Sequence, residues 1–424
     1  MAYKFETLAL HAGIQTDETL SRGVPVYRTS SYLFKNTEHA ANLFALKELG
    51  NIYTRLMNPT HDMLEKRMAA LEGGGAALAL ASGTSGIFYT VVNICGKGNE
   101  VVSSNKLYGG TYTMFHTILP ELGIKVHFVD PEDPANFENA INENTRLIFS
   151  EVIGNPVLDV VNLKGISKIA KKHNLPFAVD STFTPPCLIR PLEHGVDIVI
   201  HSLTKWIGGH GTGIGGVVVD SCKFDWTDKK FHLYNEPDES YHGLRWARDL
   251  GDLSPLAFIL RMRLVPLRNL GACISPDNAW MFLQGIETLP LRMQRHCDNA
   301  IKVAEYLKAN GKVEWIRFPG LKDDPSYNNA KAQLENGFGG MVVFGIKGGR
   351  AAGEKFINSL KLFSQLANVG DAKSLAIHPA STTHSQMTEK DLEEADIPQD
   401  MVRLSVGIEN IDDIIADIEQ ALNT

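Results

Sequence analysis

The sequence predicts an α/β protein whose larger domain surrounds a mainly parallel sheet. Short apolar segments of strand length alternate with segments of helical periodicity from residue 61 to about residue 220. Strands that are apolar on both faces and separated by helices are typical of parallel sheets covered on both sides. Seven segments have this character: AALALAS (76–82), EVVS (100–103), IKVHFV (124–129), RLIFSEV (146–152), PFAVD (176–180), VDIVIHS (196–202) and GGVVVD (215–220). The expected large domain therefore contains a seven-stranded sheet.

The helices of this region are recognised by spacing and by their end residues. Pro59 precedes a stretch of helical periodicity, and the glycines at 73–75 end it as a helix C-cap does. The repeating positions are Met63, Leu64, Arg67, Met68 and Leu71. Gly83 follows the first strand and opens a second helix. Further helices are expected near 110–121 and 163–173.

Three regions are expected along the chain. Residues 1–60 lack strong periodicity and are interpreted as an N-terminal arm. Residues 61–275 form the large domain, in which 221–275 interrupts the alternation as an insertion or connection. Residues 276–424 form a smaller C-terminal α+β domain. Its strands are expected at VEWIRF (313–318), GGMVVFGI (339–346) and MVRLSVGI (401–408), with a closing helix over 410–422.

The composition excludes several classes of protein. The 424 residues carry 41 basic and 49 acidic side chains, a net charge of −8, so a nucleic-acid partner is not expected. The 5 cysteines contain no CxxC pair, which argues against a disulfide framework and a cysteine zinc site. His201 and His210 lack the spacing of metal ligands, so no metal is predicted. Neither an apolar leader nor an apolar run of about 18 residues occurs, so we expect a cytoplasmic protein without a membrane partner.

Polar side chains gather where the predicted strands end, which is where open α/β sheets bind ligands. Asp180 ends a buried strand, where a carboxylate is costly unless it faces a cation. The next strand leads into Ser202, Thr204 and Lys205, so an amine follows two hydroxyls that can hold a phosphate. Burial lowers the pKa of such an amine and suits it to a Schiff base. Residues 83–84 offer helix N-terminal N–H groups to an anion.

Each of these features has a simpler explanation on its own. Asp180 can cap the following turn, Lys205 can be solvated, and residues 83–84 can be a plain capping turn. Their combination on one sheet favours pyridoxal phosphate, which needs a lysine, a carboxylate at its pyridinium nitrogen and an anion cradle. The alternative is the stretch 211–216, which matches GxGxxG. It leads into a strand and opens no helix, so dinucleotide binding is disfavoured.

The string DIVIHSLTKWIGGHG (197–211) resembles the pyridoxal-phosphate attachment signature of the Cys/Met metabolism enzymes, the cystathionine γ-synthase-like family. Supporting strings follow the family's order along nearly the whole chain: YTRLMNPT (53–60), ASGTSG (81–86), LYGGTY (107–112), EVIGNP (151–156), AVDST (178–182) and VRLSVGIE (402–409). Within the family, TLALHAG, residues 221–275 and the strings at 284–296 and 370–384 are most similar to the sulfhydrylases that act on O-acetylhomoserine.

The resemblance implies the aminotransferase-like fold (fold type I) and roles for the polar residues already described. Lys205 would be the Schiff-base lysine and proton carrier, Asp180 the pyridinium partner and Tyr108 the ring stacked on the cofactor. The phosphate would be held by Ser202, Thr204 and the N–H groups of Gly83 and Thr84. Thr84 stands where relatives often carry Gln or Met, which matters little for a backbone contact.

The resemblance also implies contacts to substrate and between subunits. Tyr53 and Arg55 would reach the phosphate of a neighbouring subunit, so a homo-oligomer is expected, a tetramer built as a dimer of dimers. Asn155, Ser374 and Arg403 would contact the substrate, with Asn155 also near the cofactor. Strand alternation places Arg403 off the core face, where its guanidinium can bind the α-carboxylate. Without the resemblance, a surface arginine fits equally well.

The implied activity is a γ-substitution in methionine biosynthesis, in which O-acetyl-L-homoserine and a sulfur nucleophile give L-homocysteine and acetate. Three enzymes of the same family remain alternatives: cystathionine γ-synthase, O-succinylhomoserine sulfhydrylase and methionine γ-lyase. A nucleotide-dependent oxidoreductase and a non-catalytic binding protein are the alternatives from other classes. The sequence leaves open the acyl group and the sulfur donor, which is free sulfide, a thiol or a sulfur-carrier protein.

Overall fold

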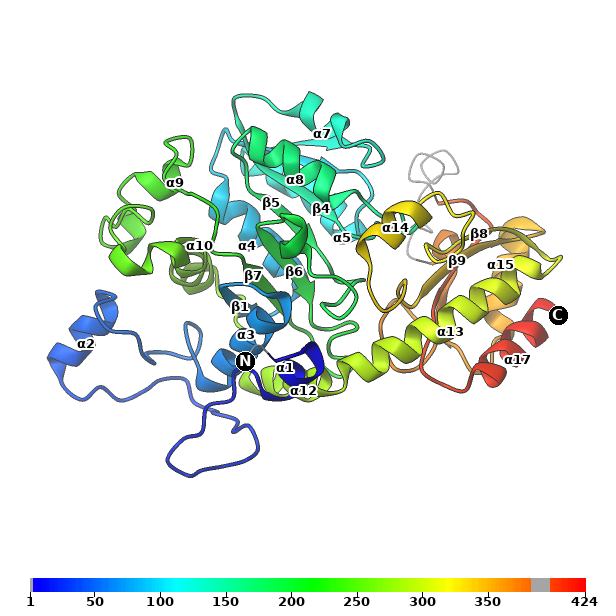
Figure 1. Ribbon diagram of the computed structural model, residues 1–424, viewed down its shortest axis with the longest axis horizontal. Coiled ribbons are helices and arrows are strands. Elements are labelled where there is room, and N and C mark those ends of the chain that lie inside the picture. The colour runs from blue at the N-terminus through cyan, green and yellow to red at the C-terminus, as the bar shows by residue number, and fades with distance from the viewer. Residues whose placement is uncertain (1–2, 383–396) are drawn as a thin grey trace.

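The computed structural model describes residues 3–382 and 397–424 (Figure 1). The large sheet has the order β1-β7-β6-β5-β4-β2-β3. Its strands are β1 (Ala76–Leu80), β2 (Glu100–Ser104), β3 (Lys125–Val129), β4 (Thr145–Glu151), β5 (Phe177–Asp180), β6 (Ile198–Ser202) and β7 (Gly216–Asp220). Strand β7 is antiparallel to both its neighbours, and the other pairs are parallel. The predicted mainly parallel, seven-stranded sheet is confirmed.

Helices cover both faces of this sheet because its strands alternate between two hydrophobic clusters. On β6, Val199 belongs to one cluster, whereas Ile198 and Ile200 belong to the other. The first cluster is covered by α1 (Phe5–His11), α3 (Pro59–Glu72), α7 (Ala135–Ala140), α8 (Leu163–Lys172) and α12 (Pro276–Glu287). The second is covered mainly by α4 (Gly83–Ile94), the helical turn Met114–Ile118 that follows α5 (Gly109–Thr113), α6 (Leu119–Glu121) and α10 (Ala257–Met262). The two layers bury most apolar side chains of the sheet, whereas those of the edge strand β3 are only partly buried.

The region 221–275 forms part of the second covering layer. Its short helices are α9 (His232–Asn235), α10 and α11 (Arg268–Leu270). Trp226 stacks on Tyr234 and Phe258, with ring centroids 4.4 and 5.6 Å apart. These buried aromatic rings pack with Ile200 and Val218 of the sheet. A region without regular periodicity therefore serves as a core layer, because large rings bury much apolar area from irregular backbone.

Helix α3 begins and ends as its sequence predicts. The Asn58 side chain accepts a hydrogen bond from Thr60 N, Pro59 occupies the first helical position, and Gly73 ends the helix in the left-handed conformation with φ of 72°. The arm 1–60, expected to be irregular, contains α1, which packs on α3 and α12, and α2 (Thr37–Phe44). Figure 1 shows α2 standing away from the body of the molecule.

The second sheet has the order β10-β11-β12-β9-β8. Its strands are β8 (Val313–Arg317), β9 (Met341–Ile346), β10 (Ser364–Gln365), β11 (Leu375–Ile377) and β12 (Met401–Ser405). Helices α13 (Leu289–Ala309), α15 (Gly349–Ser359) and α17 (Ile411–Leu422) share a hydrophobic cluster with this sheet, whereas the buried Ala330 of α14 (Tyr327–Gln333) belongs to the first cluster of the large sheet. Strands β10 and β11 were not predicted, since two or three residues are too short for a periodic signal. Among the described residues, no helix is long and apolar enough to cross a bilayer.

Helix α13 connects the part of the chain around the large sheet to the part around the second sheet. Helix α12, where the predicted small domain begins, packs on α1 and α3 of the large domain. Its Phe282, Leu283 and Ile286 belong to the first cluster of the large sheet. Helix α13 then runs from the large domain into the small one (Figure 1).

Candidate active site

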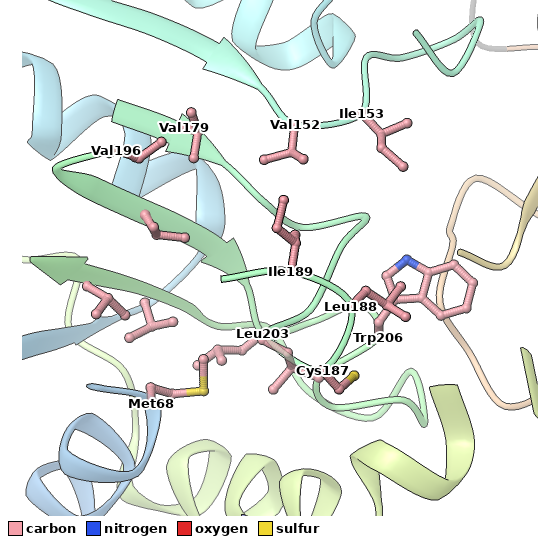
Figure 2. Packing of buried hydrophobic residues seen from close by; sticks show 14 of the residues in the cluster. Met68, Val152, Ile153, Val179, Cys187, Leu188, Ile189, Val196, Leu203 and Trp206 are labelled. Carbon is pink, nitrogen blue, oxygen red and sulfur yellow. The ribbon is translucent and has the colours of Figure 1, made fainter. Parts of the chain in front are cut away.

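The turn after β6 carries Lys205 and is anchored by two buried apolar residues. Leu203 and Trp206 are both 0% exposed, and Figure 2 shows them packed near Leu188 and Ile189 in the core below the sheet edge. The Arg292 guanidinium of α13 donates to the carbonyl oxygens of Trp206 and Ile207, at 2.7 and 2.9 Å. Lys205 is therefore held half-buried at the end of β6 by a turn that cannot shift without opening the core.

The Lys205 amine lies in surroundings that favour its neutral form. Its Nζ donates a hydrogen bond to Asn368 Oδ1 at 2.5 Å. Burial, and secondly the nearby Arg403 guanidinium, lower the pKa of Lys205 below its usual value. A neutral lysine is a nucleophile and a proton acceptor.

Asp180 closes β5 beside this turn. Its Oδ1 accepts a hydrogen bond from Thr182 N at 2.8 Å, and the Thr182 hydroxyl accepts one from Ser202 N, also at 2.8 Å. Burial is the first cause of a raised pKa for Asp180. No lysine or arginine of the described residues forms an ion pair with Asp180. A cationic ligand would relieve this cost of desolvation.

The N-terminus of α4 adjoins Ser202. Ser82 and Ser85 form a capping box, so the helix start is well defined. A Cβ at Gly83 would lie 2.7 Å from the Ser202 Cβ, so only glycine permits this approach. The first turn of a 12-residue helix thus meets the hydroxyl of Ser202, which suits an anion. The Thr204 hydroxyl instead bonds the backbone of Gly215, donating at 3.3 Å and accepting at 3.1 Å.

Tyr108 and Glu151 meet at the ends of β4 and the β2–α5 connection. The Tyr108 backbone N–H donates to Glu151 Oε1 at 2.6 Å, and Tyr108 itself is 53% exposed. Glu151 is buried and is the cross-strand neighbour of Asp180. Burial, with the Asp180 charge as a second cause, raises the pKa of Glu151 well above its usual value. Glu151 thus accepts the Tyr108 backbone N–H from surroundings that favour the protonated form of its carboxyl.

Arg403 and Asn155 join the small domain to the sheet edge. Arg403 Nη1 donates to Asn155 Oδ1 at 2.9 Å. Val402 and Leu404 are both 0% exposed on the core face of β12, so the predicted alternation places Arg403 on the opposite face. Burial lowers the pKa of Arg403 to about 10, so the guanidinium stays charged at neutral pH. A desolvated cation beside an amine and an amide is suited to a carboxylate.

A family model described as Cys/Met metabolism PLP-dependent enzyme matches residues 6–423. The chain belongs to this family. The pyridoxal-phosphate cofactor and the family predicted from the sequence are confirmed, and the chain is an enzyme.

Known relatives and a solved structure are similar to this chain over nearly their full lengths. The O-acetyl-L-homoserine sulfhydrylase of Leptospira meyeri is 55% identical, covering 99% of this chain and 97% of the relative. The homocysteine synthase of Schizosaccharomyces pombe is 49% identical, covering 99% and 98%. The crystal structure of a candidate O-acetylhomoserine (thiol)-lyase from Campylobacter jejuni is 40% identical with a TM-score of 0.96, covering 100% of both chains. It contains N′-pyridoxyl-lysine-5′-monophosphate at position 205, the number of Lys205 here.

The residues of this chain fit pyridoxal phosphate. Lys205 offers a half-buried amine for its aldehyde, Asp180 has no lysine or arginine partner within residues 3–382 and 397–424, and Gly83 brings a helix N-terminus to Ser202 for its phosphate. Tyr108 is exposed, so its ring is available to cover the cofactor. These are the residues that would hold the group.

Three predicted site residues lie elsewhere. Tyr53 and Arg55 are exposed and contact each other, with the guanidinium carbon 5.1 Å from the ring centroid. No hydrogen bond or ion pair among the described residues links them to Lys205. Ser374 is 0% exposed, and its hydroxyl donates to Glu409 and accepts from Gly407 N, both at 2.9 Å. A side chain sealed in this way has a structural role, so we withdraw the substrate contact predicted for Ser374.

Two residues at the site were given no role from the sequence. Asn368 reaches Lys205 from 163 residues away in the chain, and no local pattern marks it. Glu151 could have been found by the argument applied to Asp180, because it is also a carboxylate at the end of a buried strand.

Lys205 should be the lysine that carries the cofactor. Borohydride reduction of the holoenzyme, followed by peptide mass mapping, should place a pyridoxyl group on the peptide containing Lys205. Lys205→Ala should keep weak cofactor binding and lose turnover by roughly 1,000-fold or more, because the proton-transfer group is gone. The exposed Lys168→Ala serves as the matched control and should retain both properties. A tag on a different lysine would refute the assignment.

Glu151→Gln should change how stability depends on pH. The pKa of Glu151 is raised in the folded protein, so the parent must keep a proton that the unfolded chain releases above about pH 4.3. The parent therefore loses stability as pH rises above that value, and the glutamine variant, which still accepts from Tyr108 N, lacks this loss. Between pH 5.5 and 8.5, the thermal midpoint of the Glu151→Gln holoenzyme should rise relative to that of the parent holoenzyme as the pH increases.

The control for this experiment is the exposed Glu121→Gln, whose midpoint difference from the parent should not vary with pH. Glu151→Ala should lower the midpoint at every pH, since an unmade buried hydrogen bond costs about 1–3 kcal/mol. A pH-independent difference between the parent and Glu151→Gln would contradict the raised pKa of Glu151.

Proposed function

We propose that this protein is an O-acetyl-L-homoserine sulfhydrylase of methionine biosynthesis. It replaces the acetate of O-acetyl-L-homoserine by sulfur and so produces L-homocysteine. The observation that carries the proposal is that Lys205, Asn155 and Arg403 lie together. Arg403 bonds Asn155 and is near enough to Lys205 to act, after burial, on the pKa of its amine. The names of the relatives at 55% and 49% identity agree with this substrate.

Arg403 and Asn155 bind and orient the substrate α-carboxylate. The Arg403 guanidinium has five donors, of which Nη1 already bonds Asn155 Oδ1, so the rest of its planar fork remains for a carboxylate. The Asn155 amide nitrogen can donate to the same carboxylate or to the cofactor oxygen. This orientation directs the substrate Cα toward Lys205.

Lys205 carries the protons of the reaction. When bound, pyridoxal phosphate withdraws electrons from the substrate α-carbon, and Asp180 holds its ring nitrogen in the protonated form. The neutral Lys205 Nζ accepts the proton from Cα and moves a further proton at Cβ. The exposed ring of Tyr108 covers the cofactor, and Tyr108 assists Lys205 in the proton transfers. The low pKa of Lys205, caused first by burial, makes its amine available for these steps at neutral pH.

The overall reaction balances without an oxidant or a reductant. The Cγ–O bond of the ester breaks, acetate leaves with the bonding electron pair, and hydrogen sulfide ion forms the Cγ–S bond. Its hydrogen remains on the thiol of homocysteine. Free sulfide satisfies this balance as written. A small thiol would give the S-substituted homocysteine instead, and a sulfur-carrier thiocarboxylate would need one water molecule to hydrolyse the resulting thioester. The proposed reaction is that of a cytoplasmic biosynthetic enzyme.

The arm supports a shared site in a homo-oligomer. Tyr53 and Arg55 are exposed on the arm and remain unattached to Lys205 of their own chain. An arginine paired with a tyrosine ring suits the phosphate of a cofactor held by a second copy of the chain. The functional unit is then at least a dimer, and the proposed assembly is a dimer of dimers.

Homocysteine should be the main product. The purified holoenzyme, given O-acetyl-L-homoserine and sulfide, should release homocysteine and acetate in equal amounts by chromatography, and Lys205→Ala should release neither. Main products of 2-oxobutyrate and ammonia at saturating sulfide would identify a γ-lyase instead. Preference for O-succinylhomoserine would identify the succinyl-dependent sulfhydrylase. Cystathionine as the main product when cysteine is supplied would identify cystathionine γ-synthase.

Mixed subunits should restore activity if the site is shared. Arg55→Ala and Lys205→Ala are each expected to be inactive, but a hybrid dimer contains one site with both residues intact. Random exchange of equal amounts should recover about a quarter of the parent activity, because half of the dimers are hybrid and half of their sites are complete.

The matched control mixes Arg55→Ala with Tyr53→Ala, in which both arms are defective and no site is complete. This mixture should stay inactive. Subunit exchange is verified by mass spectrometry of differently tagged subunits. Exchange without recovery in the first mixture would contradict the shared site.

A further inference from the structure

The loop 154–159 carries Asn155 and is closed on itself by its own backbone. Gly154 N donates to Asp159 O at 2.8 Å, and Leu158 N donates to Gly154 O at 3.2 Å. The flanking residues Ile153 and Val160 form an antiparallel bridge. A loop closed in this way moves as a unit, so a contact at Asp159 also determines where Asn155 lies.

One side of the loop rests on the connection that leads to Tyr108. A Cβ at Gly154 would lie 2.9 Å from the Lys106 Cβ and 3.1 Å from the Lys106 carbonyl oxygen. Glycine is therefore required for this close packing, which prevents the loop from moving toward Tyr108. The opposite direction, toward the small domain, must be restrained by other contacts.

The small domain contacts the loop with two arginines. Arg403 of β12 donates to Asn155 Oδ1 at 2.9 Å, and Arg317 of β8 bonds Asp159 Oδ1 at 2.7 Å. The side chains of Arg317 and Asp159 are 21% and 18% exposed, so solvent screens their attraction less than that of a surface pair. Arg317 Nε also lies 3.2 Å from Oδ2 of the buried Asp324, which fixes the guanidinium within its own domain.

We propose that the Asp159–Arg317 ion pair positions the carboxylate-binding site. It anchors the loop 154–159 to the small domain at the end opposite Asn155, so that the Asn155 amide and the Arg403 guanidinium hold one geometry. Asp159 and Arg317 are positioning residues and touch no substrate. The inference rests on the proposed function, since it assigns the α-carboxylate of the substrate to Arg403 and Asn155.

The contacts downstream of the loop allow positioning to be separated from general stabilisation of the domain interface. The Gln333 side chain of α14 accepts from Leu163 N at 2.9 Å and donates to Val161 O at 2.8 Å. It joins the same two domains on the same segment but beyond the loop. Gln333→Ala is therefore the matched control, which weakens the interface and leaves the loop's own anchors in place.

The test variant is Asp159→Asn, which keeps the shape and removes the charge. Arg317 is left unchanged, because its removal would also deprive Asp324 of its cation. A shift of the carboxylate site of well under 1 Å should raise the KM for O-acetyl-L-homoserine and the inhibition constant of L-norleucine about ten-fold, with kcat changed less than about three-fold. The KM for sulfide, which has no carboxylate, should not change. Gln333→Ala should lower the thermal midpoint without this selective effect.

A double variant tests the route of the effect. In the Arg403→Lys background the carboxylate fork is already lost. Adding Asp159→Asn should therefore raise the KM for O-acetyl-L-homoserine by a clearly smaller factor than it does in the parent. Full additivity would overturn the proposal, as would unchanged constants in Asp159→Asn or equal increases in the KM for both substrates. The same pattern of effects from Gln333→Ala would also overturn it.

Binding without turnover separates this inference from the proposed function. Titration of the holoenzyme with L-norleucine, followed by visible absorbance, measures carboxylate-dependent binding even if no homocysteine is formed. Absence of homocysteine from the parent would refute the sulfhydrylase function alone. Unchanged L-norleucine affinity in Asp159→Asn would refute the positioning role alone.

Discussion

The burial of Leu203 and Trp206 on either side of a short turn is the constraint on which the site depends. Both side chains lie in the large core, and Arg292 holds the carbonyl groups that follow (Figure 2). Lys205 is thereby kept at a sheet edge, partly out of water, where its amine loses its charge more easily than in solution. Packing in the core thus determines both the position of Lys205 and the lowered pKa of its amine.

Desolvation acts on four ionisable groups near the ends of β4, β5, β6 and on β12. It lowers the pKa of Lys205 and Arg403 and raises that of Asp180 and Glu151. For Glu151 the Asp180 charge is a second cause of the raised pKa, as expected when like groups share a buried site.

The small domain contributes polar side chains to the site, whereas the sheet edge that carries Lys205 and Asp180 belongs to the large domain. Asn368 holds Lys205, and Arg403 and Arg317 hold the two ends of the loop 154–159. The relative position of the two domains therefore determines where Arg403 and Asn155 lie with respect to Lys205. This makes the domain interface a part of the site's geometry even where its residues touch no substrate.

The sequence by itself determined the seven-stranded sheet, the residues at its strand ends and the family, because apolar runs, caps and attachment motifs are local in the chain. It also placed Arg403 off the core face by simple alternation. It did not reveal the aromatic layer at 221–275, the sealed hydroxyl of Ser374 or the contact of Asn368 with Lys205. Those features depend on which distant segments pack together, and side-chain burial and long-range hydrogen bonds are decided only by that packing.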